Sequence, residues 1–218
     1  MVPIPSQIRS ASKSVSSLAV LAGFAVAGYA ALPVAAAQAA TGTTCPETTL
    51  IQPFKAIEEK EKVKEPGYYS LVSGGAFEAG ETAWTLSGGA KVASGGGISA
   101  LTGKEPKNSL ELPKGAVAVS PLTCVEPNDR TFRFLDRNES GTTTLTVSVV
   151  YEGLTGASKV STLTAATGKE LAASAILHTG AHEAAKLSGG LASMSIRFEA
   201  TGGTARVDDV YLDPRMRR

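Results

Sequence analysis

Short runs of alternating apolar and polar residues recur through most of the chain, separated by glycine or proline. The clearest run, residues 143–151, reads TTLTVSVVY and is β-branched almost throughout. About nine such runs lie between residues 68 and 212, a rhythm typical of an all-β sandwich or barrel rather than of βαβ units. Residues 169–187 are rich in alanine and leucine, and there we expect a helical turn or an irregular loop.

The first 39 residues differ in kind from the rest. Arg9 and Lys13 supply positive charge, no acidic residue precedes Glu47, and a long apolar stretch ends in the small residues Ala-Gln-Ala at 37–39. These features predict a secretory signal peptide cleaved after Ala39, and hence a secreted mature protein. The apolar stretch approaches membrane-spanning length, so an uncleaved anchor is the alternative.

Cleavage would remove two basic residues and leave 19 basic against 20 acidic ones, so the formal net charge would change from +1 to −1. A nearly neutral domain has no general attraction for nucleic acid, and we expect no stable membrane insertion after cleavage. Residues 40–66 would then be an extended arm and a charged connector, KAIEEKEKVKE, which is either solvated or a partner-binding helix. Residues 67–213 are the expected β-sandwich domain, and residues 214–218 a basic tail.

The two cysteines, Cys45 and Cys124, both lie in the mature part. In an exported protein an even number of cysteines suggests a disulfide. The bond would close a loop of about 80 residues, for which chain entropy predicts roughly 4.5 kcal/mol of stabilisation. Two free thiols are the alternative.

The most specific patterns stand near the two ends of the expected domain. Residues 71–84 read LVSGGAFEAGETAW, in which the pair Gly74-Gly75 can bend the chain sharply. Residues 206–213 read RVDDVYLD, an alternating strand that stops at Pro214. We expect these two stretches to meet in one sandwich.

The segments GGAFEAGETAW and VDDVYL resemble the first and last strands of carbohydrate-binding-module-like jelly rolls, which are similar to galactose-binding-like domains. The resemblance implies a two-sheet antiparallel β-sandwich of jelly-roll type with adjacent first and last strands. The chain is also similar to a group of small exported bacterial proteins of unassigned activity, through the QPF, YYSLV-GG-FE and DDVYLDP landmarks.

In such jelly rolls a structural calcium ion often sits where the first and last strands meet, and the resemblance assigns it to Glu78 and Asp208. Calcium prefers carboxylate and carbonyl oxygen ligands. Strand parity favours Asp208 over Asp209, because Asp208 and Val210 are expected on the same, core-facing side. The alternative is that Arg206 or backbone amides satisfy Asp208 without a metal.

Sugar binding by such domains usually needs exposed aromatic rings. Trp84 is expected in the core, and the remaining candidate platforms are Tyr68, Tyr69, Tyr151 and Tyr211. Their alternation is equally compatible with cross-strand packing.

No sequence motif supports catalysis. His178 and His182 in HTGAHE lack the order of a His-Glu-x-x-His metalloprotease helix, and an exposed loop is the expectation there. No nucleophile elbow or phosphate loop occurs. Paired carboxylates can hydrolyse glycosides, and four could meet at the chain ends, so a glycoside hydrolase-like enzyme is a minor alternative: Glu78, Glu81, Asp208 and Asp209.

The sequence therefore predicts a secreted, non-catalytic binding module that recognises a glycan or cell-wall polysaccharide. The alternative from another class is an envelope-associated structural protein with no small ligand.

Overall fold

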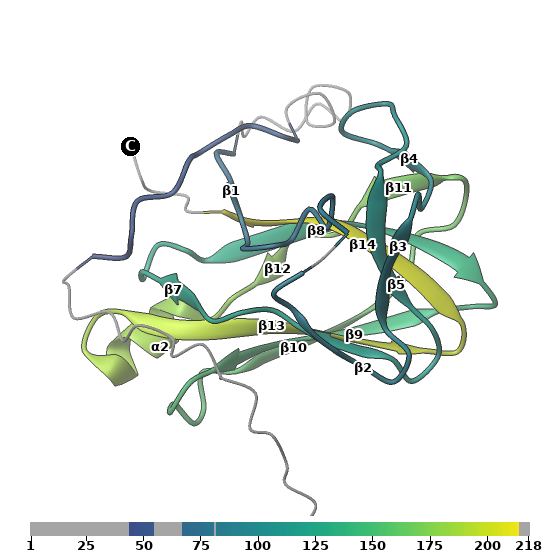
Figure 1. Ribbon diagram of the computed structural model, residues 1–218. Coiled ribbons are helices and arrows are strands. Elements are labelled where there is room, and N and C mark those ends of the chain that lie inside the picture. Colours follow the sequence, from purple (N-terminus) through teal and green to yellow (C-terminus); the bar gives the residue numbers. More distant parts are fainter. Residues whose placement is uncertain (1–43, 55–66, 81, 214–218) are drawn as a thin grey trace, which may run out of the picture. The chain divides into compact units, whose positions relative to one another are not determined.

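The computed structural model describes residues 44–54, 67–80 and 82–213. The expected signal peptide, the segment 55–66, Glu81 and the tail 214–218 lie outside the described residues. Within them, fourteen strands form two sheets packed face to face, and there is one helix (Figure 1). The predicted all-β sandwich is confirmed, with more strands than the nine or so expected from the sequence.

The larger sheet has eight strands in the order β3-β5-β14-β8-β11-β4, with β1 beside β14 and β12 beside β8. All its strand pairs are antiparallel except β4 with β11. Its strands are β1 (Ser70–Leu71), β3 (Lys91–Ser94), β4 (Ile98–Ser99), β5 (Asn108–Leu112), β8 (Thr131–Ser140), β11 (Glu170–Ala173), β12 (Leu177–His178) and β14 (Thr204–Asp213).

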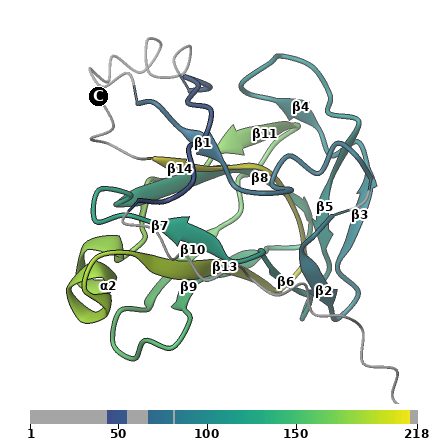
Figure 2. The ribbon, with the colours of Figure 1, turned by 60° about the vertical axis from the view of Figure 1, so that its left-hand side comes forward.

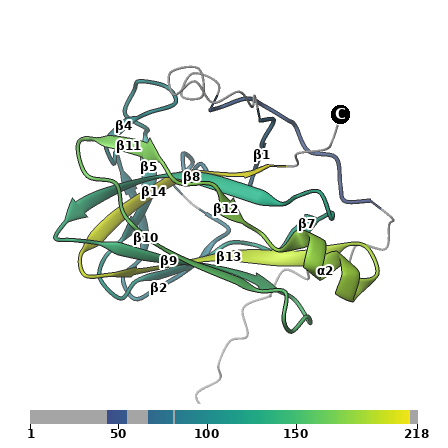
Figure 3. The same ribbon diagram turned by 180° about the vertical axis from the view of Figure 1, so that it is seen from behind.

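The smaller sheet has six strands in the order β10-β9-β13-β6-β2, with β7 beside β13. Figure 2 shows the two layers, and Figure 3 shows β9, β10 and β13 side by side with the helix at one end. Its elements are β2 (Thr85–Ser87), β6 (Val117–Val119), β7 (Thr123–Val125), β9 (Thr144–Tyr151), β10 (Lys159–Thr164), β13 (Ala192–Thr201) and the helix α2 (Ala181–Ser188). No helix in the described ranges is long and apolar enough to cross a membrane.

The core lies between the sheets and is built by strand alternation. Phe132 and Phe134 of β8 face inward from the larger sheet, and Met194, Ile196 and Phe198 of β13 face inward from the smaller one. Each of these side chains is almost fully buried, and the rings of Phe134 and Phe198 meet edge to face, 4.8 Å between centroids. The alternation of side chains along these two strands therefore supplies the inner faces of both sheets.

Trp84 is buried, as the sequence analysis expected. Its ring stacks on Phe198 with centroids 5.8 Å apart and leans on Phe77 at 5.3 Å. Its indole N–H donates a hydrogen bond to the carbonyl of Ser73 at 3.0 Å. A buried indole needs such a partner, so Trp84 joins the first turn to the core of the smaller sheet.

The predicted disulfide between Cys45 and Cys124 is confirmed, with 5.6 Å between the Cα atoms. The following arm reaches the outer face of the larger sheet. There Phe54, 0 % exposed, packs edge-on against Tyr69 and Tyr211, with ring centroids 4.9 and 5.7 Å away. The arm is thus part of the folded unit rather than a loose extension.

Candidate functional site

The two ends of the domain meet, as predicted, through backbone hydrogen bonds. Val72 N–H donates to the carbonyl of Val210 at 2.9 Å, and Val210 N–H donates to the carbonyl of Gly75 at 3.1 Å. Gly74 has φ +68°, which a residue with a side chain rarely adopts. The glycine turn therefore holds the first strand region directly against β14.

Three carboxylates gather beside this junction: Glu78, Asp208 and Asp209. Glu78 is exposed, and its carboxylate accepts the N–H of Lys107 at 3.1 and 3.2 Å. Asp208 is 1 % exposed and accepts the N–H of Asp209 at 2.8 Å. Glu78 acts electrostatically on both aspartates, so the structure brings together the two residues that the sequence nominated and adds a third.

The expected parity of the last strand was wrong. Asp208 pairs with Leu135, which belongs to the outer cluster with Phe54, whereas Val207 and Val210 both reach the inner core. The ladder is irregular between Asp208 and Tyr211, and Asp209 has φ +49°. This bulge switches the facing of the strand, so Asp208 is buried on the outer side and not beside Val210.

The acidic cluster favours a proton or a cation. Burial, with the neighbouring charges of Asp209 and Glu78, raises the pKa of Asp208 to about 8, although the hydrogen bond from the Asp209 N–H opposes the rise. Burial, with a smaller contribution from the charge of Glu78, raises the pKa of Asp209 to about 6, although the hydrogen bond from the Tyr211 hydroxyl opposes the rise. Carboxylates held together in this way repel each other unless a cation or a proton lies between them.

The alternative partner, Arg206, is engaged elsewhere. Its guanidinium forms ion pairs with Glu139 at 2.5 Å and with Glu111 at 2.7 Å. No Lys or Arg forms an ion pair with Asp208 or Asp209 in the part of the chain that the structure describes. The donor set is all oxygen, which fits calcium in chemistry. Among the described residues, no three His, Cys, Asp or Glu side chains, these carboxylates included, are arranged so that they could hold a metal ion.

The network around Arg206 was missed by the sequence reasoning. It lies on the outer face of the larger sheet, where Arg137 and Lys91 also pair with Glu139 and Glu111 at 3.6 and 3.1 Å. The loop Gly95-Gly96-Gly97 passes over it, and a Cβ on Gly96 would collide with Ser109. The sequence did carry a signal for this network: charged residues stand inside otherwise alternating strands, and a run of three glycines lies between two of the strands.

The four predicted tyrosine platforms occupy different environments. Tyr69, Tyr151 and Tyr211 are buried, and the hydroxyl of Tyr151 donates to the carbonyl of Thr179 at 3.0 Å. Tyr68 is 53 % exposed, and it is the ring among these four that a sugar could reach in this structure. The structure does not bring the four together at one surface.

The residues considered for catalysis fall into two groups, the two histidines and the acids of the junction. Both histidines are exposed as expected, but His178 is on β12 and His182 in α2 rather than in a loop. Glu183 of the helix pairs with Lys159 at 3.8 Å. The acids considered for glycoside hydrolysis are those of the junction, of which Glu81 lies outside the described residues.

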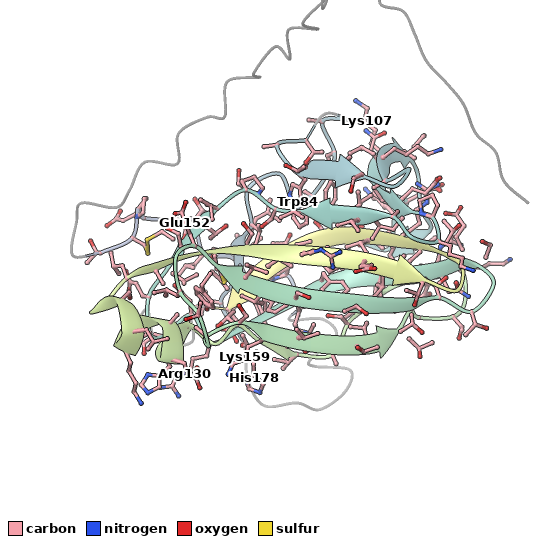
Figure 4. The ribbon with its side chains drawn as sticks, turned by 90° about the horizontal axis from the view of Figure 1, so that it is seen from below. Trp84, Lys107, Arg130, Glu152, Lys159 and His178 are labelled. Carbon is pink, nitrogen blue, oxygen red and sulfur yellow. A yellow bond between two sulfur atoms is a disulfide. The ribbon has the colours of Figure 1, made fainter. Side chains whose placement is uncertain are left out.

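The outer face of the smaller sheet is open and rich in hydroxyl groups. We call it the hydroxyl face and define it by the outward side chains of β9, β10 and β13, which Figure 4 views directly. They are Thr144, Thr146, Ser148, Val150, Val160, Thr162, Thr164, Ser193, Ser195, Arg197, Glu199 and Thr201. Arg197 and Glu199 pair with each other at 2.7 Å, so this set carries no net charge.

No family model matches the chain, and no relative among curated proteins matches it. Among solved structures, it is similar to a family 61 carbohydrate-binding module in complex with β-1,4-galactotriose, at 19 % identity and TM-score 0.42, covering 65 % of this chain and 96 % of that one. The enzymatically active domain of tailspike protein 4 from bacteriophage CBA120 matches at 18 % identity and TM-score 0.41, over 65 % of this chain and 21 % of that one.

A family 11 carbohydrate-binding module of a cellulosomal cellulase of Clostridium thermocellum matches at 13 % identity and TM-score 0.34, over 66 % of this chain and 94 % of that one. The matched structures thus include carbohydrate-binding modules, the group that the end motifs resemble.

Proposed function

We propose that this protein is a secreted, non-catalytic module that binds a neutral polysaccharide through the hydroxyl face. The observation that supports the proposal is the open outer side of β9, β10 and β13, which combines serine and threonine hydroxyls with no net charge. Each hydroxyl both donates and accepts a hydrogen bond, which matches the hydroxyl groups of sugars.

The spacing of this face suits an extended polymer. Alternate residues along one strand lie about 6.8 Å apart, and neighbouring strands about 4.8 Å apart. Threonine methyl groups and the exposed Val150 and Val160, 46 and 68 % exposed, add apolar contact for the C–H faces of sugar rings. The absence of net charge on the face favours a neutral polymer over an anionic one.

Structural calcium at the chain-end junction belongs to the same proposal. Glu78 and Asp208, joined by Asp209, would hold the ion, and carbonyl oxygens or water would complete its shell. The ion would fasten the two ends of the chain and take no part in binding sugar.

The second candidate is an envelope-associated structural protein with no small ligand. The burial of Trp84, Tyr69, Tyr151 and Tyr211 favours it, because these rings are not available to stack on a sugar. Tyr68 is the exposed ring of the predicted set, at the start of the domain.

Binding to insoluble cellulose, chitin and β-1,3-glucan, together with a glycan array, tests the proposal. Wild-type protein should co-sediment with at least one neutral polymer, and the double variant Thr146→Glu/Thr162→Glu should stay in the supernatant. The matched control is Thr102→Glu/Thr167→Glu, which adds the same charge at exposed loop positions. If neither the polymers nor the array retain the wild-type protein, the glycan proposal fails and the structural alternative stands.

A further inference from the structure

Strand β10 forms one rim of the smaller sheet. All six of its residues pair with β9 in an unbroken antiparallel register, from Lys159 opposite Val149 to Thr164 opposite Thr144. Within the described residues β9 is its only ladder partner. In Figure 4 the label Lys159 marks the start of this strand. The other side of β10 therefore presents backbone N–H and C=O groups with no strand beside them.

The other sheet edges are short or charged, as proteins commonly arrange them. At the far end of the same sheet, β2 has three residues and runs into Gly88-Gly89. In the larger sheet, β4 has two residues, and β3 has four and carries the ion-paired Lys91. β10 reads KVSTLT, with no proline or glycine and with its one charge at the first position.

We infer that β10 is an interaction surface for a second copy of this chain, which pairs β10 with β10 antiparallel about a twofold axis. The pairing joins the two six-stranded sheets into one continuous sheet. It goes beyond the proposed glycan binding and does not depend on it.

The side chains of β10 suit this self-pairing. Two registers of the β10–β10 pair keep Val160, Thr162 and Thr164 of both copies on the same face of the joined sheet. In the first register Ser161 lies opposite Ser161 of the second copy, and in the second register Thr162 lies opposite Thr162. In the first register Lys159 lies opposite Leu163, and in the second opposite residue 165, an alanine. Lys159 is also paired with Glu183 of its own chain at 3.8 Å. No like charges therefore face each other, as a self-complementary interface requires.

The geometry also limits the size and strength of the assembly. One strand per subunit buries less than the roughly 1,200 Å² of a standard stable interface, so the association is weak and depends on concentration. Because the opposite edge, β2, is short, the twofold pairing at β10 closes at two copies. The expected species is a reversible dimer.

Sedimentation velocity over roughly a hundredfold range of protein concentration tests the inference. The wild-type protein should shift reversibly from monomer toward dimer. The variant Val160→Lys/Thr162→Lys puts lysine opposite lysine in both registers and should weaken the dimer by about tenfold or more. The control Thr146→Lys/Ser148→Lys adds the same charges to the same face one strand inward, at the β9 partners of these residues, and should dimerise like the wild type.

Charge complementation separates lost pairing from lost folding. The variant Val160→Glu/Thr162→Glu should also be monomeric alone, and mixing it with the lysine variant should restore the dimer. A wild-type protein that stays monomeric at the highest concentration, a lysine variant that dimerises unchanged, or assemblies larger than two would each overturn the inference.

Discussion

The backbone N–H of Val210 donates a hydrogen bond to the carbonyl of Gly75 at 3.1 Å, which fastens the last strand to the first turn of the domain. The contact needs glycine for its size, because a Cβ on Gly75 would lie 2.9 Å from the carbonyl oxygen of Val72 and 3.1 Å from Val210. Both distances are to rigid backbone or to a buried β-branched residue. Glycine is therefore needed at position 75 because the backbone of Val72 and the residue Val210 lie so close, and not because of a positive φ angle.

Gly75→Ala should lower the free energy of unfolding by about 1–3 kcal/mol, because the added methyl group separates Val72 from Val210. Urea unfolding measures the loss, and hydrogen exchange should show faster exchange of the amides of Val72 and Val210. Ser73→Ala, at an exposed position in the same turn, is the control and should change stability by less than about 0.5 kcal/mol. An alanine variant as stable as the control would contradict the close-packing account.

Replacing both cysteines tests how much the disulfide that holds the N-terminal arm contributes to stability. The disulfide spans 79 residues, so Cys45→Ser/Cys124→Ser should lose up to about 4.5 kcal/mol through the greater entropy of the unfolded chain. The backbone N–H of Cys45 also donates to Glu126 at 3.1 Å, and this contact should loosen with the arm. Urea unfolding of the wild type with and without reductant should reproduce the difference, and equal midpoints would refute it.

Because of Asp136, the free energy of unfolding should fall as pH rises. The side chain is 2 % exposed and accepts the N–H of Ala166 at 2.6 Å. Burial raises its pKa to about 6, although the hydrogen bond from Ala166 stabilises the ionised form and opposes part of the rise. In the unfolded chain the carboxyl ionises near its ordinary value of about 4, so between about pH 4 and 6 the folded state binds more protons than the unfolded state. The stability contributed by this proton is complete below about pH 4 and is lost as pH rises through about 6.

Asp136→Asn should remove this part of the pH dependence, which is at most about 3 kcal/mol. The asparagine carbonyl can still accept the N–H of Ala166. Thermal unfolding of both proteins from pH 4 to 7 gives the difference curve, in which contributions from other carboxylates cancel. Glu152→Gln, at an exposed position, should give a flat difference curve. A flat curve for Asp136→Asn as well would show that this residue does not titrate as described.

The strands of the core could be predicted because their side chains alternate. Residues 143–151 revealed β9 in this way, and β13 and the outward threonines of the hydroxyl face follow the same alternation. In β8, which runs from Thr131 to Ser140, the apolar alternation covers only the first half. Its second half is polar, and there Glu139 pairs with Arg137 of the same strand and with Arg206 of β14, while the glycine loop lies against Arg137. Only the tertiary structure supplies those partners.

The sequence could predict which residues meet at the chain-end junction, but not the side of the sheet on which Asp208 lies. The motif pair located Glu78 and Asp208 near each other, which their electrostatic interaction supports. The bulge at Asp209 has no sequence signal strong enough to show where the ladder slips, and one slipped residue reverses every later side chain. The short strands β4, β11 and β12 were also missed, because two to four residues of mixed composition carry no readable period.

The last prediction concerns calcium at the chain-end junction. If Glu78, Asp208 and Asp209 hold the ion, calcium binds only the folded protein and stabilises it by about 2.7 kcal/mol when free calcium exceeds its dissociation constant a hundredfold. The melting temperature of the wild-type protein should therefore be higher in millimolar calcium than in chelator. Magnesium should substitute poorly, because it needs a smaller and more regular oxygen shell.

Asp208→Asn and Glu78→Gln should each abolish most of the calcium-dependent rise in melting temperature, because each removes a charged oxygen ligand. In chelator the Asp208→Asn protein should be at least as stable as the wild type, since a neutral amide does not repel the carboxylates of Asp209 and Glu78. Glu152→Gln is the control; Figure 4 shows Glu152 well apart from Lys107, whose backbone binds Glu78. A wild-type melting temperature that is the same in chelator and in calcium would mean that a proton, and not a metal, stabilises this cluster.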